Sequence, residues 1–337
     1  MPRKITVSNL IKIMHDFAPP ALAYDWDNVG FLLGDAASEI KNILLCLDIT
    51  PQCVDEAIRL HANLIISHHP LIFRPLKKIT NPLYLKLIKN EIAVISAHTN
   101  LDITPQGVNH QLAELFCLND LEILSSSIGS DLFQVAVYSP LAALDDLTKA
   151  LQISGARNFN YSPSTGEIKL EFFCDSFDLN KIIASIHKHH PAPDPVYAVY
   201  PQKQMNKLYG LGVIGSLPDP ITISDFAGIA KETLQTPAIK VWLANKKPET
   251  VIQKIALCGG SGSSLIASAS NRADLMLSGE FGYHSMLDSP LPLIEAGHFH
   301  TEFPVLDYIK KLLEAADIKS TILPRNLHET STHILYL

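Results

Sequence analysis

The stretch NILLCLDITPQCVDEAIRLHANLIISHHP (residues 42–70) contains two apolar runs separated by a segment with helical spacing. Residues 42–50 predict a buried strand, the segment after them a helix, and residues 63–70 a second strand that ends at Pro70. EIAVISAHTNLD (91–102) predicts a further strand after another helical segment. Apolar strands that alternate with helices are typical of a mainly parallel sheet covered on both faces, so we predict an α/β fold.

The pattern changes in the middle of the chain. Residues 131–202 contain the pattern of strand, helix, two strands around a turn, helix and strand, and this order predicts a ferredoxin-like α+β unit. Alternating strands and helices then return, up to a last predicted strand, STHILYL (331–337). A chain of 337 residues is also longer than one typical domain. We therefore predict one discontinuous α/β domain, residues 1–129 with 207–337, and an inserted domain, residues 130–206.

The composition excludes several classes of protein. The chain is 47% hydrophobic and 18% charged, which supports a sizeable core and argues against disorder. Its net charge is -7 and its lysines and arginines are scattered, so nucleic-acid binding is not expected. The five cysteines include no Cys-x-x-Cys pair, which predicts reduced, buried thiols. With no signal-peptide core and no apolar run near the ~18 residues of a membrane span, we expect a soluble, cytoplasmic protein.

Histidines stand at two predicted strand ends, where ligand sites of α/β sheets gather. His68 and His69 end the strand over 63–70, and the chain contains 14 histidines in all. Either both rings turn toward one cavity as metal ligands, or one is buried and hydrogen-bonded while the other is exposed. His98 and Asp102 end the next strand in the same manner. Asp102 is either a metal ligand or the N-cap of the helix that starts near residue 105.

A third group of candidate ligands lies near the C-terminus. PLIEAGHFH (292–300) predicts a strand, and the helix after it brings His298 and Glu302, four residues apart, onto one face. His300 is two residues from His298, so we expect it to point elsewhere and to be structural. Three histidines with Asp and Glu form a mixed nitrogen and oxygen set that suits Zn, Mn, Fe, Co or Ni better than Ca. Five such side chains exceed the three of a one-zinc catalytic site, which favours two ions bridged by a carboxylate.

The glycine turn GGSGSS (259–264) follows a predicted strand and opens a helix. It lacks the lysine of a P-loop and the third glycine of a dinucleotide fingerprint, which favours a tight turn over a phosphate site. The chain has no Gly-x-Ser-x-Gly elbow and no cysteine beside a histidine, so a serine or cysteine hydrolase finds no support.

Five motifs occur in an order that resembles a known family. They are WDNVGFLLGD (26–35), SHHPLIF (67–73), AHTNLD (97–102) with GVN (107–109), CGGSGSS (258–264) and GHFHTEFPVL (297–306). Together they closely resemble the GTP cyclohydrolase 1 type 2 family, also called the Ngg-one-interacting-factor-three-like family. The middle of the chain looks like the PII/CutA-like insert of the longer members, although HPAPDPVYAVY (190–200) is less acidic than the family pattern.

The resemblance implies a two-lobed α/β domain with a centre of two divalent metal ions per subunit, Zn, Fe or Mn, between the lobes. It also implies a homohexamer. Matched motif by motif, the implied metal ligands are His68, His69, Asp102, His298 and Glu302, and His98 sits beside the centre. Glu280 stands where the family usually has Gly-Asp, whereas all five ligands are retained.

The resemblance also implies an activity, the metal-dependent hydrolytic opening of the guanine ring of GTP or the attack on another small-molecule nucleotide. Bound divalent ions lower the pKa of water to about 7 and so supply a nucleophile at neutral pH. His98 is then the candidate general acid or base, because imidazole transfers protons near neutral pH. The alternative is a metal-binding regulatory or scaffold protein whose insert senses a ligand or partner.

Overall fold

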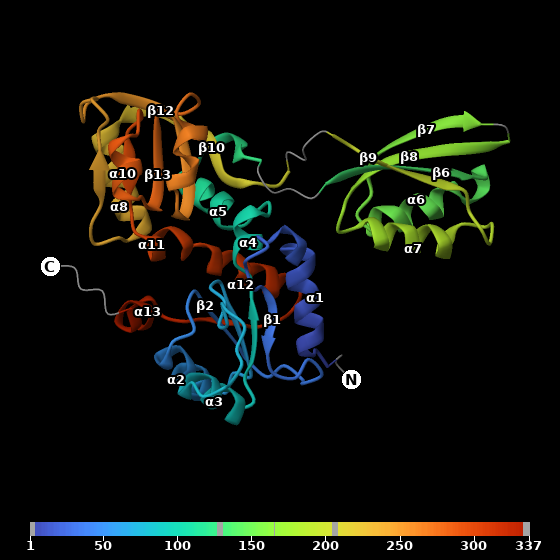
Figure 1. Cartoon of the computed structure of the whole chain (residues 1–337), viewed down its shortest axis with the longest axis horizontal. Helices are drawn as coiled ribbons and strands as arrows, with labels where there is room; N and C mark the ends of the chain where they lie inside the picture. The colour runs from blue at the N-terminus through green and yellow to red at the C-terminus, as the bar shows by residue number, and fades with distance from the viewer. Residues whose placement is uncertain (1–3, 127–130, 165, 204–207, 333–337) are drawn as a thin grey trace. The chain divides into compact units, whose positions relative to one another are not determined.

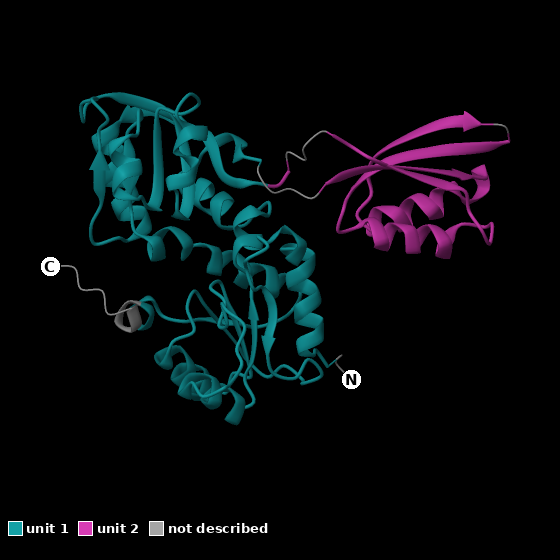
Figure 2. Ribbon diagram, in the orientation of Figure 1, with its two compact units in different colours: residues 1–128, 210–337 teal, residues 129–209 magenta. Residues whose placement is uncertain are grey.

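The computed structural model describes residues 4–126, 131–164, 166–203 and 208–332 (Figure 1). They form two compact units, residues 1–128 with 210–337 and residues 129–209 (Figure 2). Each unit has its own sheets and its own core.

The first sheet of the larger unit has the strand order β1-β4-β3-β2-β15. Its strands are β1 (Gly30–Leu33), β2 (Ile43–Cys46), β3 (Leu64–Ser67), β4 (Ala93–Ser96) and β15 (Thr321–Ile322). All neighbours pair in parallel except β1, which is antiparallel to β4. This sheet is therefore mainly parallel, as its apolar strands predicted.

Helices cover both faces of this sheet. They are α1 (Val7–Phe17), α2 (Pro51–Arg59), α3 (Pro82–Lys89) and α12 (Val305–Ala315). Within β2, Leu45 packs in the core that contains α1 and α12, whereas its neighbours Leu44 and Cys46 pack in the core that contains α2 and α3. Alternate residues of a strand point to opposite faces, so a strand buried on both sides has to be apolar throughout.

The second sheet has the order β11-β14-β13-β12-β10-β5 and is mixed. Its strands are β5 (Asn119–Ser125), β10 (Leu211–Thr222), β11 (Lys240–Trp242), β12 (Val251–Ser261), β13 (Leu275–Glu280) and β14 (Leu293–Glu295). The strands β12, β13 and β14 are parallel, and the outer ones pair antiparallel. The helices around it are α5 (Val108–Leu115), α8 (Ile223–Leu234), α9 (Ile266–Ala269) and α10 (Tyr283–Leu287).

Four expectations need correction. The strand predicted over 91–102 ends at Ser96, and its last residues belong to the helix α4 (Thr99–Ile103). The strand predicted over 292–300 ends at Glu295, because Gly297 has a left-handed φ of 91° and turns the chain into the helix α11 (His298–Glu302). Of the strand predicted over 331–337, the first two residues belong to the helix α13 (Arg325–Thr332), and the rest lies outside the described residues. Of the five free cysteines only Cys117, at a left-handed turn after α5, is exposed rather than buried.

The smaller unit is a single sheet with two helices. It runs β6 (Leu132–Ser139), α6 (Leu144–Ile153), β7 (Arg157–Ser164), β8 (Glu167–Asp175), α7 (Leu179–His189) and β9 (Tyr197–Pro201). The element order is the predicted one, and the strands lie in the antiparallel order β7-β8-β6-β9. Its core joins Leu147 and Ile182 of the helices to Val135 and Phe172 of the sheet. Among the described helices, none is long and apolar enough to cross a membrane.

Deleting the smaller unit is expected to leave a folded, metal-binding protein. The hydrophobic clusters of the larger unit contain none of the described residues of 129–209. Ser125 and Leu211, on either side of the insertion, are register partners in β5 and β10. A short glycine-serine linker can therefore replace residues 129–209. We expect the melting temperature of the larger unit to shift by no more than roughly 2–4 °C, which corresponds to about 1 kcal/mol for a unit of this size.

Circular dichroism melting and elemental analysis of the deletion protein measure these two properties. An insoluble or metal-free product would contradict the prediction, and light scattering would show whether a lost contact between copies is the cause.

Candidate metal centre

His68 and His69 leave the end of β3 into one common site. Their backbone N–H groups donate to the carbonyls of Cys46 (3.1 Å) and Leu47 (2.9 Å), which continues the ladder between β3 and β2 by two residues. The side chain of His68 is fully buried and that of His69 is 25% exposed. Their ring centroids are 4.9 Å apart. Of the alternative with one buried, hydrogen-bonded ring and one exposed ring, His68 fits the first part, but the ring of His69 is only 25% exposed and lies 3.1 Å from Glu302.

The carboxylate of Glu302 lies among three imidazoles. Its Oε1 is 3.0 Å from His298 Nε2 and 3.6 Å from His68 Nε2, and its Oε2 is 3.1 Å from His69 Nε2. His298 and Glu302 occupy the first and last positions of α11, so one helical turn brings them together, as their spacing predicted. The ligand atoms of His68, His69 and Glu302 all lie within 4.8 Å of one another, close enough to hold a metal ion.

Asp102 lies beside His68, with 3.6 Å between its Oδ1 and His68 Nε2. It belongs to the short helix α4 (Thr99–Ile103), and the next helix, α5, has Gly107 as its N-cap. The alternative that Asp102 caps that helix is therefore wrong. Burial raises the pKa of Asp102 above its ordinary value, and the imidazole of His68 opposes that rise.

Each of the three histidines holds its outer ring nitrogen in a polar contact. His68 Nδ1 donates to the Ala97 carbonyl (2.8 Å), and His69 Nδ1 donates to Asp48 Oδ1 (2.8 Å). His298 Nδ1 is 3.3 Å from Glu280 Oε1. Carbonyl and carboxylate oxygens accept only, so Nδ1 carries a proton and Nε2 is directed toward the cluster. Metal-bound histidines show this same arrangement of outer partners.

Two buried atoms in the cluster lack a hydrogen-bond partner within the described chain, His68 Nε2 and Glu302 Oε2. His69 Nε2 lies 3.1 Å from Glu302 Oε2 but not in hydrogen-bonding geometry. An unsatisfied buried polar atom costs about 1–3 kcal/mol, so such atoms call for a ligand. A divalent cation coordinated by both atoms satisfies them, and the nitrogen and oxygen donors suit a transition metal or zinc. The residues present therefore fit the metal that was expected.

The glycine turn predicted from GGSGSS lies against this cluster. Gly260 has a left-handed φ of 63°, and a Cβ there would lie 2.3 Å from Glu302 Oε1 and 3.1 Å from His298 Nε2. Glycine is therefore needed both for the backbone conformation and for the close approach to Glu302.

The electrostatics of the cluster favour positive charge. Burial lowers the pKa of His69, but the hydrogen bond to Asp48 and the nearby charge of Glu302 outweigh this effect and raise that pKa to about 11. The hydrogen bond to Glu302 raises the pKa of His298 to about 9. Burial would raise the pKa of Glu302, yet the three imidazoles hold it well below its usual range. The cluster therefore stabilises positive charge, which bound divalent ions would supply.

His98 is fixed beside the cluster by Asp27. Its Nδ1 donates to Asp27 Oδ1 (2.9 Å), and its ring centroid is 5.4 Å from that of His68 and 5.5 Å from that of His69. The other oxygen of Asp27 accepts from the backbone N–H and hydroxyl of Thr99. Burial would raise the pKa of Asp27, but these hydrogen bonds together lower it to about 2. Asp27 is therefore a fixed anion that orients His98.

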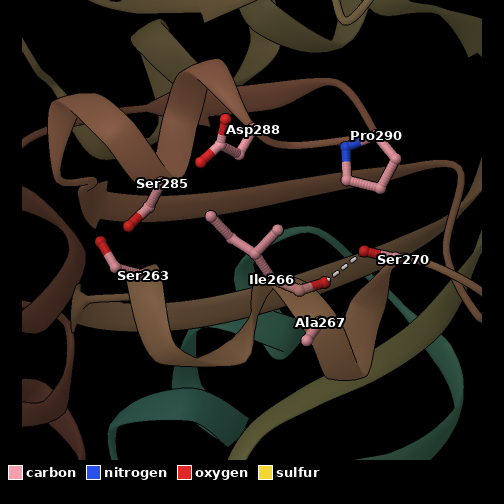
Figure 3. Close-up of a pocket in the computed structure, with 7 residues that line it drawn as sticks. All are labelled: Ser263, Ile266, Ala267, Ser270, Ser285, Asp288 and Pro290. Carbon is pink, nitrogen blue, oxygen red and sulfur yellow. Dashed lines mark hydrogen bonds between the residues drawn. The ribbon is translucent and has the colours of Figure 1, made fainter.

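The sequence reasoning missed the roles of Asp27, Asp48 and Glu280. Asp48 directly follows a buried strand, so the rule that selected His68 could also have selected it. His300, predicted to be structural, is buried with its ring against Phe299, and it is not a member of the ligand group. A cavity of about 470 Å³ near α9 and α10, lined in part by Ser263 and Asp288, contains none of the predicted site residues (Figure 3).

Acid is expected to destabilise the protein through His328. This buried residue of α13 accepts a hydrogen bond from the N–H of Leu47 (3.2 Å), next to Asp48, and burial lowers its pKa to about 4. An unfolded histidine titrates near 6.5, so the stabilisation is complete above that pH. It is lost as the pH falls from 6.5 to 4, by about 3 kcal/mol in all.

Denaturant unfolding of the wild type and of His328→Gln across this pH range measures the effect. The variant keeps an acceptor without a titrating ring, so its stability should fall less steeply with acid. An equal slope for both proteins would show that His328 does not control the loss.

The chain resembles known proteins over both units. The family model Duf34/NIF3 (NGG1p interacting factor 3) matches residues 5–327. A Halalkalibacterium halodurans protein named GTP cyclohydrolase 1 type 2 homolog is 31% identical over 95% of this chain and 96% of its own length. A Staphylococcus epidermidis protein of the same name is 32% identical over 91% of this chain and 93% of its own. The crystal structure of a Bacillus cereus protein related to NIF3 has a TM-score of 0.85 at 29% identity, covering 99% of this chain and 100% of that one.

Proposed function

The chain belongs to the Duf34/NIF3 family, and on this basis we propose that it is a hydrolase that depends on two divalent metal ions and acts on GTP or another nucleotide. The names of its relatives support a nucleotide substrate. The observation that carries the proposal is the position of Glu302, whose Oε1 lies near His298 and whose Oε2 lies near His69. The Nδ1 atoms of His68 and His69 are hydrogen-bonded to Ala97 and Asp48, which leaves their Nε2 atoms directed toward Glu302.

The five candidate ligands divide into two sets that share Glu302. His68 and Asp102 form one set, 3.6 Å apart, and His69 and His298 form the other, with ring centroids 5.6 Å apart. Glu302 would help to hold both ions, because its carboxylate lies near members of both sets. A carboxylate shared by two ions about 3.5–4 Å apart is common in two-metal hydrolases.

The residues of the centre would divide the chemistry among them. Divalent ions, when bound, lower the pKa of water to about 7 and polarise the group under attack. Glu302 and Asp102 supply the negative charge that holds the ions, and the imidazoles supply the neutral donors. His98 exchanges a proton with the substrate at Nε2, and Asp27 keeps its ring in place.

The protein is expected to contain two divalent ions per chain. Elemental analysis of freshly purified protein, repeated after reconstitution with excess Zn²⁺ or Mn²⁺, measures the number. At most one ion under both conditions would contradict the dinuclear centre.

The same preparation tests the activity. Metal-dependent turnover of GTP or another nucleotide supports the hydrolase, whereas two bound ions without turnover of any nucleotide would favour the metal-binding regulatory or scaffold protein.

The proposal extends to the smaller unit and to the assembly. The β-α-β-β-α-β order and the antiparallel strand order β7-β8-β6-β9 support a ferredoxin-like domain of the PII/CutA-like kind, inserted within residues 130–206. We also predict that this domain is independent of the domain of residues 1–129 and 207–337, and the deletion protein tests this. A homohexameric assembly is a further prediction, which light scattering tests. A cytoplasmic location is predicted as well.

A further inference from the structure

Three aromatic side chains form a cluster that meets His98, beside the candidate metal centre, through Trp26. We call Tyr24, Trp26 and Phe73 the aromatic platform. Trp26 stacks on Tyr24 with ring centroids 5.5 Å apart and 9° between the planes, and it lies 5.8 Å from Phe73. Its centroid is 6.2 Å from that of His98, in an edge-on arrangement. Trp26 is nevertheless 58% exposed and Phe73 48% exposed.

The platform is tied by hydrogen bonds to Asp27 and Thr99, the same two residues that fix His98. The N–H of Tyr24 donates to the hydroxyl of Thr99 (3.1 Å), and the N–H of Asp27 donates to the carbonyl of Tyr24 (2.9 Å). The side chain of Asn28 donates to the carbonyl of Ile72, which joins this turn to the loop that carries Phe73. Because the two loops are tied together and Asp27 also binds His98, the backbone that carries these rings is joined to the site.

We propose that the aromatic platform binds the planar heteroaromatic ring of the substrate by stacking on Trp26 and Phe73, with the reacting edge of that ring toward His98. This assignment rests on the proposed function and adds the site that would hold the base. One face of Trp26 is already covered by Tyr24, so its large exposed area belongs to the opposite face and the ring edges. Rigid exposed aromatics beside a polar, ion-binding cluster suit a ligand with a flat ring and an electronegative part.

Trp26 can report on this binding through its own fluorescence. The chain has two tryptophans, and Trp242 is the other. The indole N–H of Trp242 is buried without a hydrogen-bond partner in the described chain, so Trp242→Phe breaks no hydrogen bond and leaves Trp26 as the sole tryptophan. Guanosine and GTP should quench this signal with saturation, and inorganic triphosphate, which has no ring, should not. No quenching by guanosine at concentrations where calorimetry detects its binding would overturn the proposal.

Three variants separate stacking from a general apolar contact. Trp26→Ala should weaken guanosine binding roughly 10- to 100-fold, the range expected for the loss of one base–aromatic stack, and Trp26→Phe should restore part of it. Ile79→Ala is the control, because Ile79 is 51% exposed, is carried by the same loop as Phe73 and has no aromatic face. Equal losses in Trp26→Ala and Ile79→Ala would contradict stacking.

The experiment also distinguishes failure of this site from failure of the proposed function. Guanosine binding that depends on Trp26, in a protein that turns over no nucleotide, supports the platform and contradicts the hydrolase. Turnover with the same KM in wild type and Trp26→Ala supports the hydrolase and contradicts the platform. If Trp26→Ala instead changes the mass of the assembly and leaves guanosine binding intact, the platform is a contact between copies of the chain and the proposal is wrong.

Discussion

Glu302→Gln is expected to empty the metal centre. The substitution keeps the shape of the side chain and removes the buried charge that faces His68, His69 and His298. Loss of one member of a buried charge cluster costs about 3–5 kcal/mol, which corresponds to roughly two to three and a half orders of magnitude in metal affinity. Elemental analysis should find at least one site empty, and any metal-dependent turnover should fall by a similar factor.

The competing explanation is that the Glu302 carboxylate only interacts favourably with a helix dipole. Its loss would then lower the stability by about 0.3–1 kcal/mol and leave the metal content unchanged. Glu314→Gln is the matched control, because it removes the same charge from the exposed surface of α12, where Glu314 pairs with Lys310. His300→Ala tests the other candidate of the same motif. Full metal in Glu302→Gln together with loss of metal in His300→Ala would show that the ligands of this motif were assigned wrongly.

His98→Gln is expected to lower turnover by roughly 10²- to 10⁴-fold, the range for loss of a general acid or base. The metal content should stay at the wild-type level, since His98 is held by Asp27 beside the cluster and the group of close ligand atoms is formed by other residues. Steady-state kinetics and elemental analysis on the same preparation measure the two quantities together.

His284→Gln is the control for the loss of an imidazole, because His284 is exposed on α10 and contacts Tyr283. It should leave both turnover and metal unchanged. Loss of metal in His98→Gln would make His98 a ligand, and unchanged turnover would remove it from the mechanism. Asp27→Asn should cause a smaller loss of turnover than His98→Gln, because the ring remains but is no longer held by an anion.

The ligand candidates could be found from sequence because the rule that selects them is local. A buried strand is recognised by its apolar run, and the residue after its last position lies at an edge where ligands gather. This rule selected His68, just after the end of β3, and Asp102. The structure places Asp102 on the helix α4 rather than at a strand end, 3.6 Å from His68. The four-residue spacing of His298 and Glu302 placed them on one helical turn, although the strand predicted to contain His298 ends earlier, at Glu295.

The sequence could not show which imidazole each outer partner contacts. Asp48 contacts His69, and Glu280 contacts His298. Both contacts depend on how β2, β13 and α11 are placed in three dimensions. Asp27 lies in a turn without periodic structure, and its hydrogen bonds to His98 and Thr99 join residues more than 70 positions apart. Sequence periodicity reports which face a residue occupies, and it carries no information on which distant residue faces it.

The amino-acid sequence alone determined the α/β class, the mainly parallel character of the first sheet, the separate pattern of the middle segment and the residue types of the candidate metal centre. Each of these follows from local properties, namely apolar runs, helical spacing and turn residues, that hold wherever the segment lies. The three-dimensional fold decided that Glu302 stands between three imidazoles, that Asp27 and Asp48 orient His98 and His69, and that Trp26 stays exposed beside them. These depend on the packing of segments far apart in the chain, because an unsatisfied buried charge or an exposed ring is defined only by its neighbours.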